Sequence, residues 1–275
     1  MKSLLFAAML SLVSACASAN ERWTVYYGHT LPAESFASFD MVVLDATYDA
    51  PVAALKAQGK TVLGYLSLGE AENYRPYYKK LKAKKLLLEA NPEWKGHYII
   101  DIRNPQWGKI VAEELIPEIL AKGFDGIMFD TIDSPLHLAI QKKDKYQGMN
   151  EAAVKLLCDI RGAHPNVTLM LNRGFDVLTQ AAPCIDMLLA ESTRTDLQLS
   201  GKKKPKLLSE EDYRWYVSKM KEAQAIAPAL KIYSLDYWPI KDMEGVAKIY
   251  AEQRANGFIP YVSTIDLQQV YTEPN

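Results

Sequence analysis

Short apolar runs alternate with stretches of helical pattern along almost the whole chain. Nine of these runs have the pattern of strands, at residues 23–28, 41–44, 61–68, 98–102, 127–129, 167–171, 185–190, 230–235 and 258–262. Strands that alternate with helices form a parallel sheet with right-handed crossovers. Eight such units close a barrel at a chain length of 275 residues. The sequence therefore predicts an α/β fold, a single (β/α)8 TIM barrel, with the run at 98–102 as an extra β run inserted in the third βα connection.

Polar residues follow the last apolar residue of several of these runs. They are Asp45, Glu70, Asp130, Asn172, Glu191 and Asp236. In a barrel of parallel strands all of these ends face one mouth, which is where barrel enzymes keep their catalytic residues. A single residue of this kind is often the cap of the next helix, but the repeated pattern predicts a site at the mouth.

The stretch from Lys122 to Asp133 has the clearest version of this pattern. Gly123 suits the end of a helix, because glycine takes positive φ without strain. Residues 127–129 then form an apolar run typical of a strand covered on both faces, and the run stops at Asp130. Burying a carboxylate is costly unless the charge is paired, so we expect Asp130 to face a partner or a ligand. For Asp133, which precedes Ser-Pro, a helix cap and a ligand contact are both open.

The predicted mouth is rich in carboxylates and poor in metal ligands. The four histidines, His29, His97, His137 and His164, have no spacing typical of a zinc site. Neither a glycine-rich phosphate loop nor a Gly-x-Ser-x-Gly elbow occurs. Paired carboxylates without a metal suit glycoside hydrolysis, in which one attacks the sugar or activates water and the other protonates the leaving oxygen. We therefore expect a hydrolase that uses no metal and no cofactor.

Aromatic residues close to the mouth are candidates to stack on the apolar faces of sugar rings. They are Tyr27, Tyr65, Tyr74, Trp107, Tyr237, Trp238 and Tyr261, and we expect many of them to belong to the core or rim. Together with the polar residues they give the candidate substrate-binding set, which is Tyr27, Asp45, Tyr65, Ser67, Glu70, Asp133, Asn172, Asp236, Tyr237 and Trp238.

The first residues have the pattern of an export signal. Lys2 precedes an apolar stretch at residues 4–13 that is too short to span a bilayer. Cleavage after the small residues at 17–19 would remove residues 1–19 and leave one domain at 20–275. Alternatively, a lipobox ends at Cys16, so that residues 1–15 are removed and Cys16 is lipidated. Both interpretations predict a periplasmic or extracellular protein, and the second predicts an outer-membrane lipoprotein.

The two remaining cysteines and the net charge of the chain bear on its compartment and its partners. Cys158 and Cys184 would pair in an oxidising compartment, and the alternative is two buried free thiols. The net charge of −1 does not indicate a nucleic-acid partner. We expect a monomer that touches a membrane only through a lipid at Cys16.

Four motifs give a family resemblance over nearly the whole mature chain. They are Tyr-Tyr-Gly at 26–28, Gly-Tyr-Leu-Ser-Leu-Gly-Glu at 64–70, Asp-Ile-Arg at 101–103 and Gly-Phe-Asp-Gly-Ile-Met-Phe-Asp-Thr-Ile-Asp at 123–133. This pattern resembles glycoside hydrolase family 114, the endo-α-1,4-polygalactosaminidase-like family, and is similar to the hydrolase domain of Pel polysaccharide enzymes. The resemblance implies a (β/α)8 barrel that cleaves polymers of α-1,4-linked galactosamine or N-acetylgalactosamine.

The resemblance also implies two catalytic acids, at the ends of the fourth and sixth strands. By position these are Asp130 and Glu191. Analogy with other retaining α-glycosidase barrels makes Asp130 the nucleophile and Glu191 the acid/base. Met-Phe-Asp at 128–130 replaces the more usual Phe-Leu-Asp, which is a conservative change. The acidic mouth predicts a preference for a cationic, partly de-N-acetylated polymer over an acidic one.

Two other functions of the same residues remain open. One is a non-catalytic barrel that binds polysaccharide without turnover. The other is a metal-dependent hydrolase or lyase that uses the ring of carboxylates to hold its ion.

Overall fold

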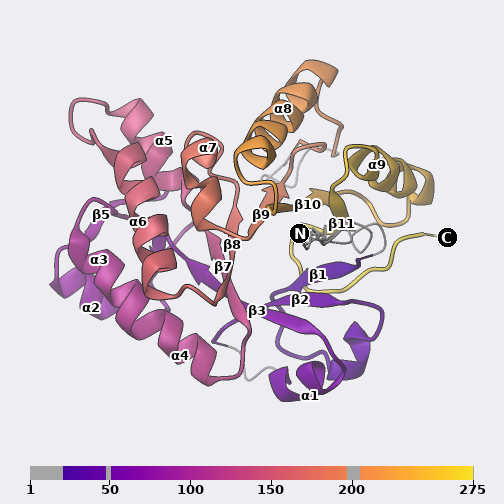
Figure 1. Cartoon of the computed structure of the whole chain (residues 1–275), viewed down its shortest axis with the longest axis horizontal. Coiled ribbons are helices and arrows are strands. Elements are labelled where there is room, and N and C mark those ends of the chain that lie inside the picture. Colours follow the sequence, from indigo (N-terminus) through magenta and orange to yellow (C-terminus); the bar gives the residue numbers. More distant parts are fainter. Residues whose placement is uncertain (1–20, 48–50, 197–204, 275) are drawn as a thin grey trace, which may run out of the picture.

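The structure, a computed structural model, describes residues 21–47, 51–196 and 205–274. Within these ranges eight parallel strands form a nearly closed barrel, with helices around its periphery (Figure 1). The strands pair in the order β1 (Trp23–Tyr26), β2 (Met41–Asp45), β3 (Thr61–Ser67), β7 (Gly126–Asp130), β8 (Thr168–Asn172), β9 (Met187–Glu191), β10 (Lys231–Tyr237) and β11 (Ile259–Ser263). This order confirms the predicted (β/α)8 barrel. The predicted signal segment at 1–19, with Cys16, lies outside the described residues.

Strands β1 and β11 stand at the two ends of the pairing order, and side chains connect them. The indole N–H of Trp23 donates to the carbonyl oxygen of Ile259 over 2.9 Å. The rings of Trp23 and Tyr261 lie 5.7 Å apart, and both residues are buried. A buried aromatic residue removes much apolar surface from water while its N–H keeps a partner. These contacts therefore hold the two ends of the sheet together.

The helices of the barrel follow its strands in sequence. They are α1 (Val52–Ala57), α3 (Pro105–Ile110), α4 (Ile116–Ala121), α5 (Asp133–Gln141), α6 (Met149–Ala163), α7 (Leu178–Ala181), α8 (Glu210–Ile226) and α9 (Met243–Ala255), with the 3-10 turns η1 (Ala33–Phe36) and η3 (Ala182–Cys184). At the start of α3 the Asn104 side chain accepts the N–H of Gln106 over 3.0 Å, as expected for a cap. Between α3 and α4 the regular α-helix is interrupted by the π turn η2 (Val111–Leu115). Pro117 follows this turn and has no N–H for a regular helical bond, which accounts for the interruption.

The strands of the barrel are buried on both faces, as their continuous apolar runs predicted. On β7, Ile127, Met128 and Phe129 are at most 1% exposed. Full burial of one such side chain contributes about 1.5–3 kcal/mol. Gly123, with φ of +97°, closes α4 just before this strand. The ends of the strands are therefore set on a rigid frame.

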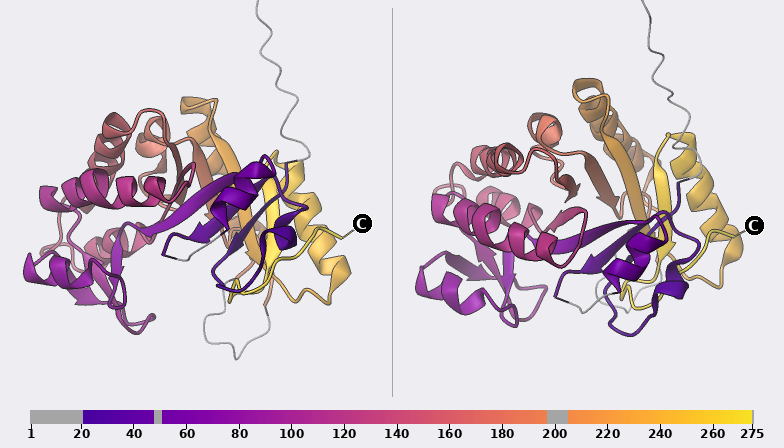
Figure 2. Two further views of the ribbon diagram at one scale, coloured as in Figure 1. Left: turned by 90° about the horizontal axis from the view of Figure 1, so that it is seen from below. Right: turned by 60° about the horizontal axis from the view of Figure 1, so that its bottom comes forward.

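A small antiparallel sheet interrupts the barrel sequence between β3 and β7. It consists of β4 (Glu70–Glu72), β5 (Leu87–Ala90) and β6 (His97–Ile100), paired in the order β4-β6-β5, with α2 (Tyr78–Ala83) between β4 and β5. We call residues 70–100 the insert. The run expected at 98–102 overlaps β6, whereas β4 and β5 had no counterpart in the prediction. In the views of Figures 1 and 2 the insert lies on the side of the molecule away from β11 and α9.

Cys158 on α6 and Cys184 in η3 form a disulfide, with their Cα atoms 5.0 Å apart. The bond joins the helix before β8 to the turn before β9, and these two strands carry Asn172 and Glu191. Among the described residues, none of the helices combines the length and apolar character that a bilayer crossing requires.

Candidate active site

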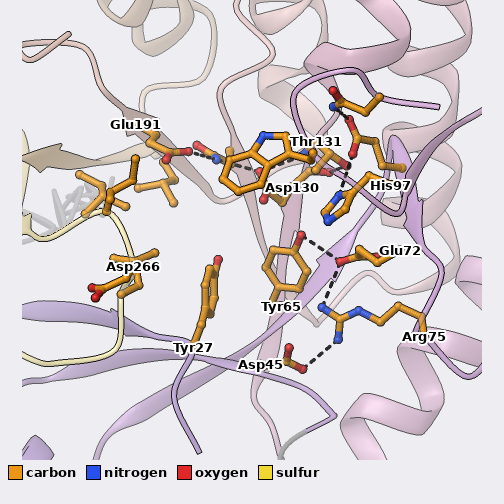
Figure 3. A pocket seen from close by; sticks show the side chains of 18 of the residues that line it. Tyr27, Asp45, Tyr65, Glu72, Arg75, His97, Asp130, Thr131, Glu191 and Asp266 are labelled. Carbon is orange, nitrogen blue, oxygen red and sulfur yellow. Dashed lines mark hydrogen bonds and ion pairs between the residues drawn. The ribbon is translucent and has the colours of Figure 1, made fainter. Parts of the chain in front are cut away.

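A cavity of about 670 Å³ opens at the carboxyl ends of the barrel strands (Figure 3). The predicted site residues that line it are Tyr27, Asp45, Tyr65, Glu70, Asp130, Asn172, Glu191 and Tyr237. Pockets that hold drug-sized ligands have volumes of about 300–1,000 Å³, so the cavity accommodates more than one sugar ring.

The side chain of Asn172 joins the two predicted catalytic acids. Its Nδ2 donates to Asp130 Oδ1 over 2.8 Å and to Glu191 Oε2 over 2.6 Å. Because both bonds share one nitrogen, these two oxygens lie no more than 5.4 Å apart. The Tyr237 hydroxyl donates to Glu191 Oε1 over 2.6 Å, and the backbone N–H of Thr131 donates to Asp130 Oδ1 over 2.8 Å. Both carboxyl groups are thus oriented from two sides.

Burial and the close approach of two acids change the ionisation of this site. Burial, and next the charge of Glu191, raise the pKa of Asp130 from 3.8 to about 7. A like charge this close disfavours the ionised form of Asp130, as burial does. Burial and the neighbouring carboxylates also raise the pKa of Tyr27, Tyr65 and Tyr237 well above 10.0. These phenols stay neutral and can donate hydrogen bonds.

The backbone turns sharply directly after three of these strands. Thr131, Arg173 and Ser192 have φ values of +65°, +58° and +52°, in the left-handed region that residues other than glycine rarely adopt. Each one follows a residue of the carboxyl–amide–carboxyl group described above. Such conformations cost about 1–3 kcal/mol each and persist where surrounding structure imposes them. They end β7, β8 and β9 at the point where the polar side chains face the cavity.

A buried arginine that the sequence analysis missed organises the neighbouring wall. Arg75 donates from Nη1 to Asp45 Oδ1 over 2.9 Å and from Nη2 to Glu72 Oε1 over 3.1 Å. Its guanidinium also lies 5.2 Å from the centre of the Tyr65 ring. Burial alone would raise the pKa of Asp45, but Arg75 holds that pKa below its ordinary value. Asp45 is therefore an ionised partner of Arg75 at the edge of the cavity.

Glu70 ties the insert to the barrel. It is 1% exposed and accepts from Asn91 Nδ2 over 2.6 Å, from His97 Nδ1 over 3.0 Å and from the Ser134 hydroxyl. Burial would raise the pKa of Glu70, yet these hydrogen bonds, that of His97 first, lower it. Glu70 thus lines the cavity but has its oxygens engaged by neighbouring side chains.

Two predicted substrate-binding residues, on β10 and just after it, are not among the residues that line the cavity. Asp236 is completely buried and accepts from two backbone N–H groups of the loop after β9 and from Gln253 Nε2 of α9. Strand β10 continues two residues beyond the expected end at Leu235, and successive strand side chains point to opposite faces. Tyr237 therefore faces the mouth and Asp236 the helices. Trp238 lies beyond the strand and donates its indole N–H to Asp242 over 2.8 Å.

Ser67 and Asp133 also lie outside the cavity lining. The Ser67 hydroxyl donates to the carbonyl oxygen of Glu70 over 2.8 Å and is covered completely. Asp133 accepts from Arg173 Nε over 2.8 Å and from the N–H of Gly174 over 2.9 Å. It therefore anchors the loop after β8, and neither of its two anticipated roles, helix cap or ligand contact, applies. Among the aromatic candidates, Trp107 and Tyr261 belong to the core.

Several cavity residues were missed by the sequence analysis because they come from the insert or from the loop after β11. They are Arg75, Asn91, Trp94 and His97 on the insert and Asp266 after β11. The apolar residues of the insert have no regular spacing, so the sequence did not predict that this segment forms a wall of the cavity. In the part of the chain that the structure describes, His, Cys, Asp and Glu side chains form no group of three or more suited to holding a metal ion.

A (β/α)8 barrel with two linked carboxyl groups at its mouth defines the class of glycoside hydrolases built on this fold. The model of glycoside-hydrolase family GH114 matches residues 9–275. The chain therefore belongs to glycoside-hydrolase family GH114, as its motifs predicted, and is a glycoside hydrolase.

Known proteins share the sequence or the fold at moderate to low identity. An uncharacterized protein of Deinococcus radiodurans is 29% identical over 276 residues, covering 92% of this chain and 83% of the relative. The glycoside hydrolase domain of PelA from Pseudomonas aeruginosa superposes with a TM-score of 0.79 at 24% identity, covering 92% of this chain and 98% of that domain. Aspergillus fumigatus Ega3, solved in complex with galactosamine, has a TM-score of 0.69 at 14% identity, with coverage of 94% and 96%. At these identities the two structures show a shared fold.

Proposed function

We propose that the protein is an exported, endo-acting and retaining glycoside hydrolase that cleaves polysaccharides of α-1,4-linked galactosamine or N-acetylgalactosamine. The observation that carries the proposal is the Asn172 bridge, which keeps oxygens of Asp130 and Glu191 within 5.4 Å of each other. Retaining enzymes hold their two carboxyl groups about 5–5.5 Å apart, whereas inverting enzymes need about 6.5–9.5 Å to admit a water. The short separation supports the retaining route.

The chemistry then has two steps. Glu191, as the acid, gives its proton to the glycosidic oxygen while the Asp130 carboxylate attacks the anomeric carbon and forms a glycosyl ester. Glu191, now ionised, takes a proton from water while the water oxygen attacks the anomeric carbon of the ester; the bond from that carbon to Asp130 breaks, which restores the Asp130 carboxylate and releases the sugar with its new hydroxyl group. Tyr237, which donates to Glu191, orients the acid/base in both steps.

Substrate charge supports this assignment of roles. The raised pKa of Asp130 favours its protonated form, whereas attack requires Asp130 ionised and Glu191 protonated. An ammonium group on the bound sugar would lower the pKa of the nearby Asp130 carboxyl. Galactosamine carries such a group next to its anomeric carbon, and Ega3 was solved with this sugar.

The acidic wall of the cavity supports a cationic polymer in the same way. The carboxyl groups of Asp45, Glu72, Asp130, Glu191 and Asp266 line it together with the guanidinium of Arg75. A cleft with an excess of one sign of charge concentrates ligands of the opposite sign. We expect cleavage of a de-N-acetylated polymer to be faster than that of the acetylated polymer and to weaken with salt. If the acetylated and de-N-acetylated polymers were cleaved at equal rates that do not depend on salt, the proposed preference for a cationic substrate would be wrong.

Export rests on two observations of different kinds. The positive and apolar pattern at residues 2–13 suits a signal segment. The Cys158–Cys184 disulfide suits an oxidising compartment. Mass spectrometry of the mature N-terminus would distinguish a start at Asn20 from a lipidated Cys16.

The test is product release from an α-1,4-galactosamine polymer by wild type, Asp130→Asn and Glu191→Gln, with Glu222→Gln on the exposed face of α8 as the matched control. Loss of one acid should lower kcat roughly 10²–10⁴-fold, while the control keeps wild-type rates. NMR of the first product should show retained α-configuration, and a spread of oligomer lengths should show endo action. A folded wild type that binds polymer without cleaving it would instead identify a binding barrel. Activity lost on chelation and restored by a divalent cation would identify a metal-dependent enzyme.

A further inference from the structure

Trp94 presents an unusual surface in the cavity. Its side chain is 49% exposed and lines the same cavity as Asp130 and Glu191. Trp23 and Trp107, by contrast, are fully buried. An indole ring offers a flat apolar face of the size of a sugar ring, and leaving that face in water is unfavourable. Its position at a polar cavity therefore suggests a ligand that covers it.

Tyr74, the other strongly exposed aromatic residue that lines the cavity, already packs against a cation. The guanidinium of Arg75 lies 5.1 Å from the centre of the Tyr74 ring. Trp94 has a different neighbour, because the His97 ring lies 6.1 Å away and tilts by 36°. This places the imidazole of His97, whose pKa the hydrogen bond to Glu70 raises, beside the indole, and among the described residues no arginine or lysine lies over the Trp94 ring in the way that Arg75 lies over Tyr74. Trp94 is therefore the better candidate for stacking.

The turn that carries Trp94 is held in place by its own hydrogen bonds. The N–H of Asn91 donates to the carbonyl oxygen of His97 over 2.9 Å, and the N–H of His97 donates to the carbonyl oxygen of Trp94 over 3.1 Å. The Asn91 side chain also accepts the N–H of Glu93 over 2.8 Å. A fixed turn presents its aromatic ring with little entropy left to lose on binding.

Glu70 connects this turn to the catalytic strand. Both Asn91 and His97, which flank the turn, donate to the Glu70 carboxylate. The third donor, Ser134, lies on α5, which begins three residues after Asp130. The position of Trp94 is thereby tied to that of Asp130 through buried polar contacts, so the ring and the reacting centre form one rigid wall.

The strand order gives Trp94 a defined side of the cleaved bond. The insert follows β3, which pairs with β7, whereas Glu191 ends β9 on the far side of β7 and β8. In Figure 3, His97 and Glu191 lie on opposite sides of Asp130. The acid/base stands next to the leaving group, so the insert lies on the side of the sugar that is transferred to Asp130.

We propose that Trp94 forms a stacking subsite for an amino sugar ring of the bound polymer, on the glycone side of the bond that is cleaved. The inference rests on the proposed function for its substrate class. The indole face packs against the C–H face of the ring and attracts its ammonium group. The subsite gives longer chains an advantage over the monosaccharide.

The experiment measures binding in a Glu191→Gln background, so that no substrate is consumed. Calorimetry compares an α-1,4-linked galactosamine tetrasaccharide with the monosaccharide galactosamine. Trp94→Ala should weaken tetrasaccharide binding roughly tenfold and should weaken galactosamine binding much less. Trp94→Phe should recover most of the loss because it restores an aromatic face. Trp215→Ala is the matched control, since Trp215 is 47% exposed on α8 and lies outside the cavity lining.

Three results would overturn the subsite. They are an equal loss for both ligands, a loss that Trp215→Ala reproduces, and a tetrasaccharide that binds no more tightly than galactosamine when Trp94 is present. Failure of the proposed function gives a separate result, because wild type would then release no product. A selective tetrasaccharide loss in Trp94→Ala would still support the subsite in that case.

Discussion

Replacing Asp130 by asparagine should stabilise the protein at high pH while it abolishes the proposed chemistry. The pKa of Asp130 is about 7 in the folded chain against an ordinary value of 3.8. Each pKa unit corresponds to about 1.4 kcal/mol, so ionising this buried carboxyl in the folded state costs about 4 kcal/mol. Asparagine keeps an oxygen for the N–H groups of Thr131 and Asn172 and carries no charge. The free energy of unfolding should therefore rise by about 4 kcal/mol at pH 8.

The sign and the pH range follow from proton linkage. Between pH 4 and pH 7 the folded protein holds a proton on Asp130 that the unfolded chain has lost, so wild-type stability falls as pH rises through this window. Above pH 7 both states are ionised, and the contribution stays constant. The difference between Asp130→Asn and wild type should thus be small at pH 4, grow up to pH 7 and then level off.

Thermal and urea unfolding from pH 4 to pH 9 would measure this difference. At pH 8 the variant should melt roughly 10 °C above wild type. Asp159→Asn is the control, because Asp159 is exposed on α6 and pairs with Lys155 at the surface; it should change stability by about 0.5 kcal/mol or less at every pH. A stability gain for Asp130→Asn that is the same at pH 4 and pH 8, or a loss at pH 8, would refute the argument that Asp130 is a buried acid strained by its charge.

Further changes probe the fold and the site together. Gly69→Ala should destabilise by about 3 kcal/mol in urea unfolding, because its Cβ would lie 2.1 Å from a backbone carbonyl oxygen of the loop after β7; Gly162→Ala, with open space on α6, should stabilise by about 0.5–1 kcal/mol. Cys158→Ser with Cys184→Ser should lower unfolding stability by about 3.5 kcal/mol for a 26-residue separation, and reduction of wild type by dithiothreitol should match it. Asn172→Ala should lower kcat roughly 10²-fold or more without loss of fold, since it removes the donor shared by both acids; an unchanged kcat would exclude a role for the bridge.

The barrel was predictable because its signal is repeated and local. Each strand is covered on both faces, so its residues form one continuous apolar run, and each run is separated from the next by a helix. The same reasoning located Asp130, Asn172 and Glu191, because each of them is the last residue of its strand. These three residues line the cavity, as expected for polar side chains at the carboxyl ends of barrel strands.

The differences at the mouth come from uncertainty of one or two residues in where a strand ends. Ending β10 at Leu235 made Asp236 a mouth residue, but the strand continues to Tyr237. Because side chains alternate between the two faces of a strand, Leu235 and Tyr237 line the cavity and Asp236 between them faces the helices. Trp238, which was also predicted to bind substrate, lies beyond the end of the strand. Whether Asp236 can be buried on the helix side depends on a hydrogen-bond partner there, which is Gln253 of α9. A partner so far away in the chain cannot be identified from the sequence.

Strands β4 and β5 of the insert escaped prediction for a different reason. Its strands are three or four residues long and pair antiparallel across a loop, so they have neither the length nor the period that marks an element. What holds them is polar: Glu70 gathers three donors, and Arg75 joins two carboxylates. Networks of this kind depend on exact tertiary placement, and the residues that form them look in sequence like an ordinary charged surface loop.

The unfavourable features of this chain are concentrated in one place, and that concentration is itself an argument for function. Three successive strands, β7, β8 and β9, end in residues followed by left-handed backbone. The first of them also carries a buried acid whose pKa is raised to about 7. Each feature costs stability on its own, and the fold around them obeys the ordinary rules of burial and capping. Strained backbone and an unfavourable carboxyl group that occur together at the mouth of an otherwise regular barrel therefore indicate the functional residues.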